Sequence, residues 1–107
     1  MASIPEPVAA FVEAVNRHDS QAFLAAFTDD GFVDDWGRTF TGRDAIERWS
    51  DVEFIGSQGT LTPEQVTVAG DEVTIVGDWR STHANGRSRF VFAMRGDRIA
   101  SMTIREG

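Results

Sequence analysis

Residues 27–49, FTDDGFVDDWGRTFTGRDAIERW, carry the run of local signals that decides the fold. Residues 32–36 combine apolar and aromatic side chains with acidic ones and predict a short strand. Gly37-Arg38 predicts a two-residue hairpin turn with glycine first, and residues 39–41 predict the returning strand. Residues 43–49 then place apolar side chains at helical spacing. The stretch therefore predicts a small hairpin that leads directly into a helix.

The same stretch supplies the main candidate catalytic residue. Asp29-Asp30-Gly31 predicts the end of a preceding helix, because glycine takes the positive φ that such an end often needs. In the predicted hairpin Asp35 lies directly opposite Phe40, which places a carboxylate beside aromatic surface. A carboxylate in such a place is a candidate general base. The alternative is a solvated carboxylate at the strand edge, since one of Asp34 and Asp35 must point outward.

Length and composition limit the kind of protein. The 107 residues, with 41% hydrophobic side chains, predict a single domain over residues 1–107 with one packed core. The net charge of −7 disfavours binding to nucleic acid or to anionic membranes. Cysteine is absent, which excludes disulfides and thiolate chemistry in this chain. With no targeting signal or membrane span predicted, we expect a cytoplasmic protein.

Two helices are predicted upstream of the hairpin. Pro5 and Pro7 fit the first turn of a helix, where a missing N–H costs nothing. The stripe of this first helix consists of Val8, Phe11, Val12 and Val15. Asp19 or Ser20 is the natural N-cap of the short second helix. Both helices are expected to pack against one sheet.

Downstream of the hairpin and its helix, the pattern changes to that of strands. Residues 50–59 contain Asp51, Gly56, Ser57 and Gly59, which make unbroken regular structure unfavourable, and predict a loop. From residue 60 the apolar residues recur with period two. Strand segments are expected over residues 65–68, 73–76, 79–82, 87–94 and 99–104. Asn85-Gly86 is the strongest hairpin signal in the chain. The second half is therefore predicted to be an antiparallel meander.

Turn lengths predict the register of this meander. A two-residue Gly70-Asp71 turn pairs Val66 with Ile75, and a two-residue Asn85-Gly86 turn pairs Trp79 with Phe92. One face of the sheet then becomes aromatic. The other face is mixed, as expected of a dimer surface or a half-covered face.

The register of the last strand stays open at the level of the sequence. A two-residue turn at Gly96-Asp97 puts Ser101 and Thr103 on the aromatic face. A three-residue turn instead puts Ala100, Met102 and Ile104 there. The second alternative is favoured because it buries apolar side chains.

The order of elements resembles a known superfamily. The segments that carry the resemblance are Asn16-Arg17-His18-Asp19, Phe27-Thr28-Asp29-Asp30-Gly31, Val33-Asp34-Asp35, Gly42-Arg43-Asp44-Ala45-Ile46 and Gly96-Asp97-Arg98-Ile99. Together they resemble the nuclear transport factor 2-like (NTF2-like) superfamily over nearly the whole chain. The resemblance implies an α+β fold: a cone-shaped NTF2-like barrel with a curved antiparallel sheet wrapped on three N-terminal helices. It also implies a homodimer formed through the sheet.

Within that superfamily the chain looks most like the SnoaL-like polyketide cyclase and ketosteroid isomerase-like branch. The resemblance places Asp35 at the position of the general base of these enzymes. The isomerases also use a tyrosine and a protonated aspartate as oxyanion donors, and this chain has Phe11 and Phe90 at the matching positions. This departure disfavours the steroid isomerase reaction itself. The epoxide hydrolase branch, which needs an arginine between two aspartates on late strands, is set aside because Asp78-Trp79-Arg80 is only a reversed fragment.

A ligand pocket is expected on the aromatic face. Its predicted lining residues are Phe11, Val15, Phe40, Trp49, Trp79, Ser88, Phe90, Phe92 and Met102. Most of these side chains are core by default, and part of the same surface is expected to line a cavity. His83 lies on the Trp79 face and is a second candidate catalytic residue at the mouth; the alternative is an exposed hairpin histidine. Two histidines without a third close ligand predict no metal site, and no cofactor is expected.

Two functions remain after these observations. The first is a small-molecule enzyme of the isomerase or cyclase type, in which Asp35 removes a proton next to a carbonyl group of a small hydrophobic molecule. The second is a non-catalytic ligand-binding or dimerisation module, in which Asp34 and Asp35 are structural. Loss of the donors at positions 11 and 90 favours the second function.

Overall fold

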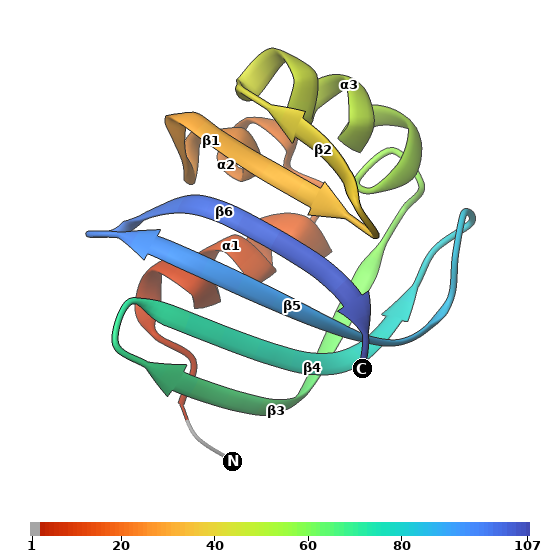
Figure 1. The fold of residues 1–107 in the computed structure, drawn as a ribbon. Helices are drawn as coiled ribbons and strands as arrows, with labels where there is room; N and C mark the ends of the chain where they lie inside the picture. Colours follow the sequence, from red (N-terminus) through yellow and green to blue (C-terminus); the bar gives the residue numbers. More distant parts are fainter. Residues whose placement is uncertain (1–2) are drawn as a thin grey trace.

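The computed structural model describes residues 3–107, and residues 1–2 of the predicted domain lie outside this range (Figure 1). Its elements are α1 (Glu6–Asn16), α2 (Ser20–Ala25), β1 (Phe27–Asp35), β2 (Arg38–Thr41), α3 (Arg43–Glu53), β3 (Thr60–Ala69), β4 (Glu72–Arg80), β5 (Gly86–Arg95) and β6 (Arg98–Glu106). The six strands form one sheet in the order β2-β1-β6-β5-β4-β3. The α+β class predicted from the sequence is confirmed. One pair, β1 with β6, is parallel, so the sheet is not wholly antiparallel.

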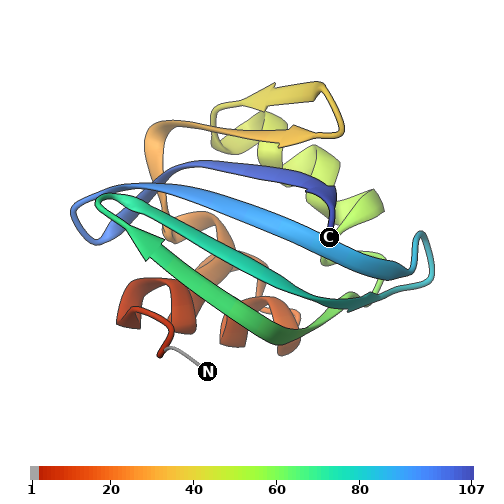
Figure 2. The same cartoon turned by 60° about the horizontal axis from the view of Figure 1, so that its bottom comes forward.

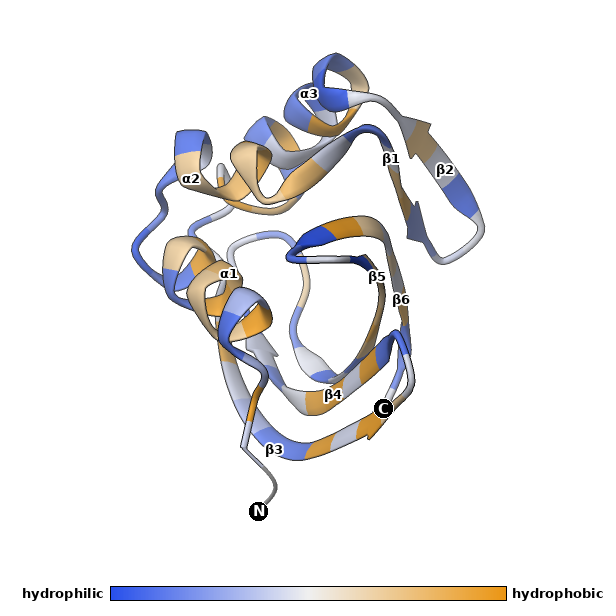
Figure 3. Cartoon of the chain, turned by 90° about the vertical axis from the view of Figure 1, so that its left-hand side faces the viewer, coloured by the Kyte–Doolittle hydropathy of each residue, from blue (hydrophilic) through white to orange (hydrophobic). Residues whose placement is uncertain are grey.

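The sheet curls around the helices, which lie on its concave side (Figures 2 and 3). Helix α1 begins after Pro5 and buries the predicted stripe, with Val8 fully inaccessible. Helix α2 is capped by Asp19, whose Oδ1 accepts a hydrogen bond from the Ala22 N–H at 3.1 Å, as predicted. Phe23 from this short helix is fully buried at the centre of the core.

Aromatic rings form the middle of this core. The Phe23 ring lies 5.3 Å from Phe11, 5.5 Å from Phe27 and 5.7 Å from Phe54, measured between ring centroids. Tilted and edge-on contacts at these distances are the favoured geometries of aromatic pairs. Four separate segments of the chain are therefore joined through one side chain.

The β1–β2 hairpin turns one residue earlier than the sequence predicted. Its central residues are Trp36 and Gly37, with φ of 54° and 92°. Two positive φ values define the turn type that matches strand twist, and glycine supplies one of them. The predicted Gly37-Arg38 turn was wrong, and so was the predicted pairing of Asp35 with Phe40: Asp35 lies opposite Arg38.

Two predicted boundaries in the opening stretch were also wrong. Strand β1 already begins at Phe27, and Gly31 lies buried inside it without a positive φ, so residues 29–31 do not end a helix. Helix α3 continues to Glu53, through the start of the predicted 50–59 loop. The reason is that Ile46, Trp49 and Ser50 continue one buried helical face, which outweighs the polar composition. The longer helix brings Glu53 to the candidate site.

The β4–β5 connection is a five-residue loop, residues 81–85, rather than a two-residue turn at Asn85-Gly86. The Asn85 side chain accepts a hydrogen bond from the Ser81 N–H at 2.9 Å and closes this loop. Trp79 consequently pairs with Gly86 instead of Phe92. The partner of Trp79 is thus displaced by six residues along β5. Because side chains alternate between the two faces of a strand, an even displacement leaves them on the predicted faces.

The other two turns were predicted more closely. Val66 pairs with Ile75, as predicted. Before β6 the turn has two residues, and a β-bulge then leaves Ala100 without a partner between Met94–Ile99 and Ala93–Ser101. The bulge restores the predicted facing of Met102 and Ile104 toward the aromatic side, although the predicted three-residue turn was wrong.

Candidate functional site

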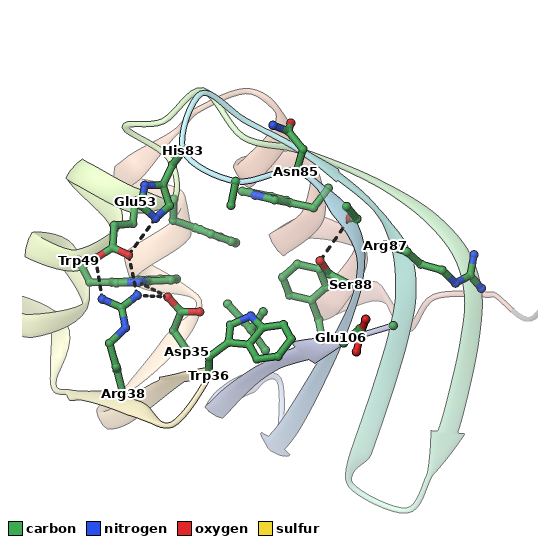
Figure 4. Close-up of a pocket in the computed structure, with 17 residues that line it drawn as sticks. Asp35, Trp36, Arg38, Trp49, Glu53, His83, Asn85, Arg87, Ser88 and Glu106 are labelled. Atoms are coloured by element: carbon green, nitrogen blue, oxygen red, sulfur yellow. Dashed lines mark hydrogen bonds and ion pairs between the residues drawn. The ribbon is translucent and has the colours of Figure 1, made fainter.

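A cavity of about 570 Å³ opens at one end of the curved sheet (Figure 4). Its walls come from the β1–β2 hairpin, the end of α3, the β4–β5 loop and the ends of β5 and β6. The apolar part of the wall consists of Trp36, Trp49, Phe54, Trp79, Phe90 and Ile104. The volume falls in the range of small-molecule sites, and an aromatic lining with a few polar groups is typical of them.

Three rings on one side of the cavity are stacked in a row. Phe54 lies between Trp79, at 4.5 Å and 9° between the ring planes, and Trp49, at 4.9 Å and 22°. Trp49 comes from α3, Phe54 follows that helix, and Trp79 comes from β4. The row therefore ties helix and sheet together and gives the wall a fixed shape.

Asp35 points into this cavity from the end of β1 (Figure 4). Its Oδ2 accepts hydrogen bonds from the Trp49 indole N–H at 3.0 Å and from Arg38 Nη2 at 2.5 Å. Within residues 3–107, Oδ1 accepts no hydrogen bond and faces the open space. One oxygen of the carboxylate is thus fixed by two donors while the other is available.

Arg38 joins Asp35 to a second carboxylate. Its Nη2 lies 2.6 Å from Glu53 Oε1, and its Nη1 lies 3.0 Å from Glu53 Oε2. His83 Nε2 lies 3.2 Å from the same Oε1. The hydrogen bond from Arg38 lowers the pKa of Glu53, and Glu53 in turn raises the pKa of Arg38. Asp35, Arg38, Glu53 and His83 therefore form one connected polar edge, which we call the Arg38 network.

Sequence reasoning did not find Arg38 and Glu53. Both depend on boundaries that were predicted wrongly, since Arg38 was assigned to a turn and Glu53 to a loop. The Trp36-Gly37 dipeptide with glycine second, and the continued helical spacing of Ile46, Trp49 and Ser50, are the signals that would have placed them.

Asp34, the neighbour of Asp35, lies on the opposite face of β1. Its two oxygens accept hydrogen bonds from Arg105 at 3.0 and 3.1 Å, and its Oδ1 also accepts one from the Gly37 N–H at 2.7 Å. The Arg105 hydrogen bonds lower the pKa of Asp34. The alternation of β1 thus gives one aspartate to the cavity and uses the other to hold the hairpin and β6 together.

The structure divides the predicted site residues into three groups. On the cavity wall lie Asp35, His83, Trp49, Trp79, Ser88 and Phe90. In the closed core, away from this wall, lie Phe11, Val15, Phe92 and Met102. Phe40 lies beside α3, in a shallow groove separate from the cavity, where it stacks on Trp49 at 5.8 Å. The earlier hairpin turn explains the position of Phe40, and complete burial between α1 and the sheet explains the core group.

His18 has a structural position far from this cavity. Its Nε2 lies 3.1 Å from the Gly59 carbonyl oxygen. Nearby, the Asn16 side chain donates a hydrogen bond to the Leu61 carbonyl oxygen and accepts one from the Leu61 N–H. The corner after α1 therefore holds the start of β3. Over residues 3–107 the structure groups no three His, Asp or Glu side chains in a way that suits a metal ion.

The Arg38 network makes a prediction about acid stability. Because the folded-state pKa of Glu53 lies below its ordinary value of 4.5, the carboxylate stabilises the fold above about pH 4.5. That contribution is lost as the pH falls through the folded-state pKa. Glu53→Gln should therefore lower the free energy of unfolding by about 1 kcal/mol at pH 7 and by much less near pH 3.

Urea unfolding followed by circular dichroism measures this difference. Glu47→Gln is the matched control, because Glu47 is an exposed residue of the same helix outside the ion pairs. An equal loss of stability at both pH values in Glu53→Gln would contradict the assignment.

Comparison with known proteins identifies the family. The model of the SnoaL-like domain matches residues 8–107, and the chain belongs to this family of the NTF2-like superfamily. This confirms the resemblance drawn from the sequence. No curated protein matches the chain.

Solved structures share the fold. A protein from Sinorhizobium meliloti assigned as a polyketide cyclase has a TM-score of 0.84 at 23% identity, covering 95% of both chains. An epoxide hydrolase/cyclase-like enzyme of pyran ring formation in the polyether salinomycin has a TM-score of 0.86 at 22% identity, covering 95% of this chain and 88% of its own.

A Mycobacterium tuberculosis protein in complex with estradiol-17beta-hemisuccinate has a TM-score of 0.83 at 18% identity, covering 95% of this chain and 92% of its own. At these identities the three structures establish the fold alone. Within residues 3–107, no helix is long and apolar enough to cross a membrane.

Proposed function

We propose that this protein is a small-molecule enzyme of the isomerase or cyclase type, with Asp35 as general base in the cavity. The observation that carries the proposal is the position of Asp35. One of its oxygens is held by Arg38 and Trp49, and the other faces an aromatic cavity of about 570 Å³. A base fixed in this way can approach a carbon-bound proton without first losing a hydrogen bond.

The remaining groups of the cavity suit the same chemistry. Proton removal next to a carbonyl group leaves negative charge on its oxygen, which needs a hydrogen-bond donor. His83 and Ser88 reach the cavity wall and take this role in the proposal, each in exchange for its present contact, with Glu53 Oε1 for His83 and with the Gly86 carbonyl oxygen for Ser88. They replace the donors that are missing because positions 11 and 90 are phenylalanines. Of these two phenylalanines, only Phe90 lines the cavity.

Known relatives support a hydrophobic substrate of this kind. One structural neighbour is assigned as a polyketide cyclase, and another was solved in complex with estradiol-17beta-hemisuccinate. The alternative is a ligand-binding module without catalysis. It is favoured by the Arg38–Asp35 ion pair, because a carboxylate that is already paired also serves as a purely structural link.

A ligand screen separates these two functions. Hydrophobic carbonyl compounds are tested by thermal shift on the wild type and on Asp35→Asn, and the bound compounds are then followed for turnover. A compound that both proteins bind and only the wild type converts supports the enzyme. Compounds that bind equally and are converted by neither protein support the module. Absence of binding by every compound contradicts both.

A further inference from the structure

The charge balance of the cavity distinguishes between classes of ligand. Two arginines, Arg38 and Arg87, reach its wall, together with three carboxylates, Asp35, Glu53 and Glu106. Arg38 is shared by Asp35 and Glu53, so this trio carries one net negative charge. The positive charge of Arg38 is therefore already neutralised by these two carboxylates.

Arg87 does not offset this charge, because it is paired outside the cavity. Its Nη1 forms an ion pair with Glu64 on β3. Figure 4 shows the side chain of Arg87 directed away from the open space, across the sheet. Among the described residues of the cavity wall, an anionic ligand thus meets no arginine without a carboxylate partner.

Glu106 adds a second negative charge at the lip of the cavity. Within residues 3–107 its carboxylate makes no ion pair and accepts no hydrogen bond from a side chain, and Figure 4 shows it beside the open space. In the parallel β1–β6 pair, Asp35 aligns with Ile104. Trp36, the next residue along the chain, therefore lies near the end of β6, the strand that carries Glu106. The Trp36 N–H donates to the Ile104 carbonyl oxygen at 3.3 Å.

Trp36 gives this lip an aromatic surface. The residue is 59% exposed and has a φ of 54°, a turn position that favours glycine, asparagine or aspartate. Neither packing within residues 3–107 nor backbone preference accounts for tryptophan here, and its side chain lines the cavity, where it is available to a ligand. Aromatic faces next to carboxylates attract ammonium groups.

Building on the proposed function, we infer that the cavity takes a hydrophobic molecule bearing an ammonium group, which binds at the Trp36–Glu106 lip, and that it rejects carboxylates of the same shape. The rest of the ligand lies against the aromatic wall, with its reacting end at Asp35. The net charge of −7 of the whole chain acts in the same direction at long range.

Three probes with one ring system test this inference: naphthylmethylamine, naphthylmethanol and naphthoate. Their dissociation constants are measured by isothermal titration calorimetry near pH 8, where histidine side chains are ordinarily neutral. The amine should bind about five- to tenfold more tightly than the alcohol, and the carboxylate should bind most weakly. Raising the salt from about 20 mM to about 300 mM should reduce the amine preference.

Variants assign the preference to the lip. Glu106→Gln should lower the amine-to-alcohol ratio about threefold, whereas Glu13→Gln, an exposed substitution on α1, should leave it unchanged. Trp36→Asn should also lower the ratio without lowering the melting temperature, because asparagine suits the positive φ. A Glu106→Gln variant that fails to fold leaves Trp36→Asn and the salt dependence as tests.

The outcomes separate this inference from the proposed function. Tight binding of the alcohol with no preference for the amine, or an amine-to-alcohol ratio that is the same in Glu106→Gln as in the wild type at low salt, overturns the ammonium site alone. Binding of naphthoate as tight as that of the amine also overturns it. Absence of binding by all three probes overturns the ammonium site and the proposed ligand cavity together.

Discussion

Asp35→Asn is expected to lower turnover of a converted ligand by about a thousandfold while its binding changes by less than about threefold. General base catalysis by one positioned group contributes on the order of a hundred- to ten-thousandfold, and an amide cannot take the proton. The asparagine side chain keeps the shape of the residue and still offers an acceptor to the Trp49 indole N–H. The loss should therefore appear in kcat, with KM little changed.

Asp34→Asn is the matched control for this result. It removes the adjacent carboxylate of the same strand, which is also paired with an arginine, but on the other face of the sheet. Turnover should stay within about threefold of the wild type. A large loss of turnover in Asp34→Asn, or a small loss in Asp35→Asn, would show that the base has been assigned to the wrong residue.

The sequence predicted the fold better than the site because the two depend on different features. The faces of the strands follow from alternation alone, so Trp79 and Phe90 stayed on the inner face although the predicted β4–β5 turn was wrong by several residues. The order of helices and strands is equally robust. The resemblance to the NTF2-like superfamily was drawn from this order and from the turn and cap segments.

The site depends on individual residue positions. Asp35 was predicted to enter an aromatic pocket, and it does lie on the cavity wall. Its partner was missed, because a one-residue change in the turn replaces Phe40 by Arg38 as the residue opposite it. The second carboxylate was missed because helix α3 continues one turn further, to Glu53. Local errors that leave a fold intact can thus change the chemistry assigned to its site.

The division between core and cavity could not be read from the pattern of apolar residues. Phe11 from α1 and Phe90 and Phe92 from β5 all belong to one core cluster, and of these three only Phe90 lines the cavity. Which rings are covered depends on where α1 and α2 end, and on the side chains that these helices carry. Phe23, which fills the centre of the core, comes from a helix of only six residues.

Phe54→Ala is expected to lower the free energy of unfolding by about 4 kcal/mol, the largest loss of stability predicted for a cavity residue. Phe54 is 4% exposed and touches the cavity with one side and the core with the other. Its ring is held by Trp49 and Trp79, and it also approaches Phe23. Removal of this ring leaves a space between three large side chains that cannot collapse onto it without moving a helix.

The same substitution should enlarge the ligand cavity, because the missing ring separates it from the core. Anthracenylmethanol should then gain affinity relative to naphthylmethanol, which calorimetry on the folded variant measures. Phe32→Ala is the matched control: Phe32 is 37% exposed, and its loss should cost about 1 kcal/mol and leave the ratio unchanged. A loss of stability in Phe54→Ala no greater than in this control would mean that the row of three rings does not form the cavity wall. The position of Phe54 between the cavity and the core predicts the opposite, namely that one side chain sets both the shape of the binding site and the stability of the fold.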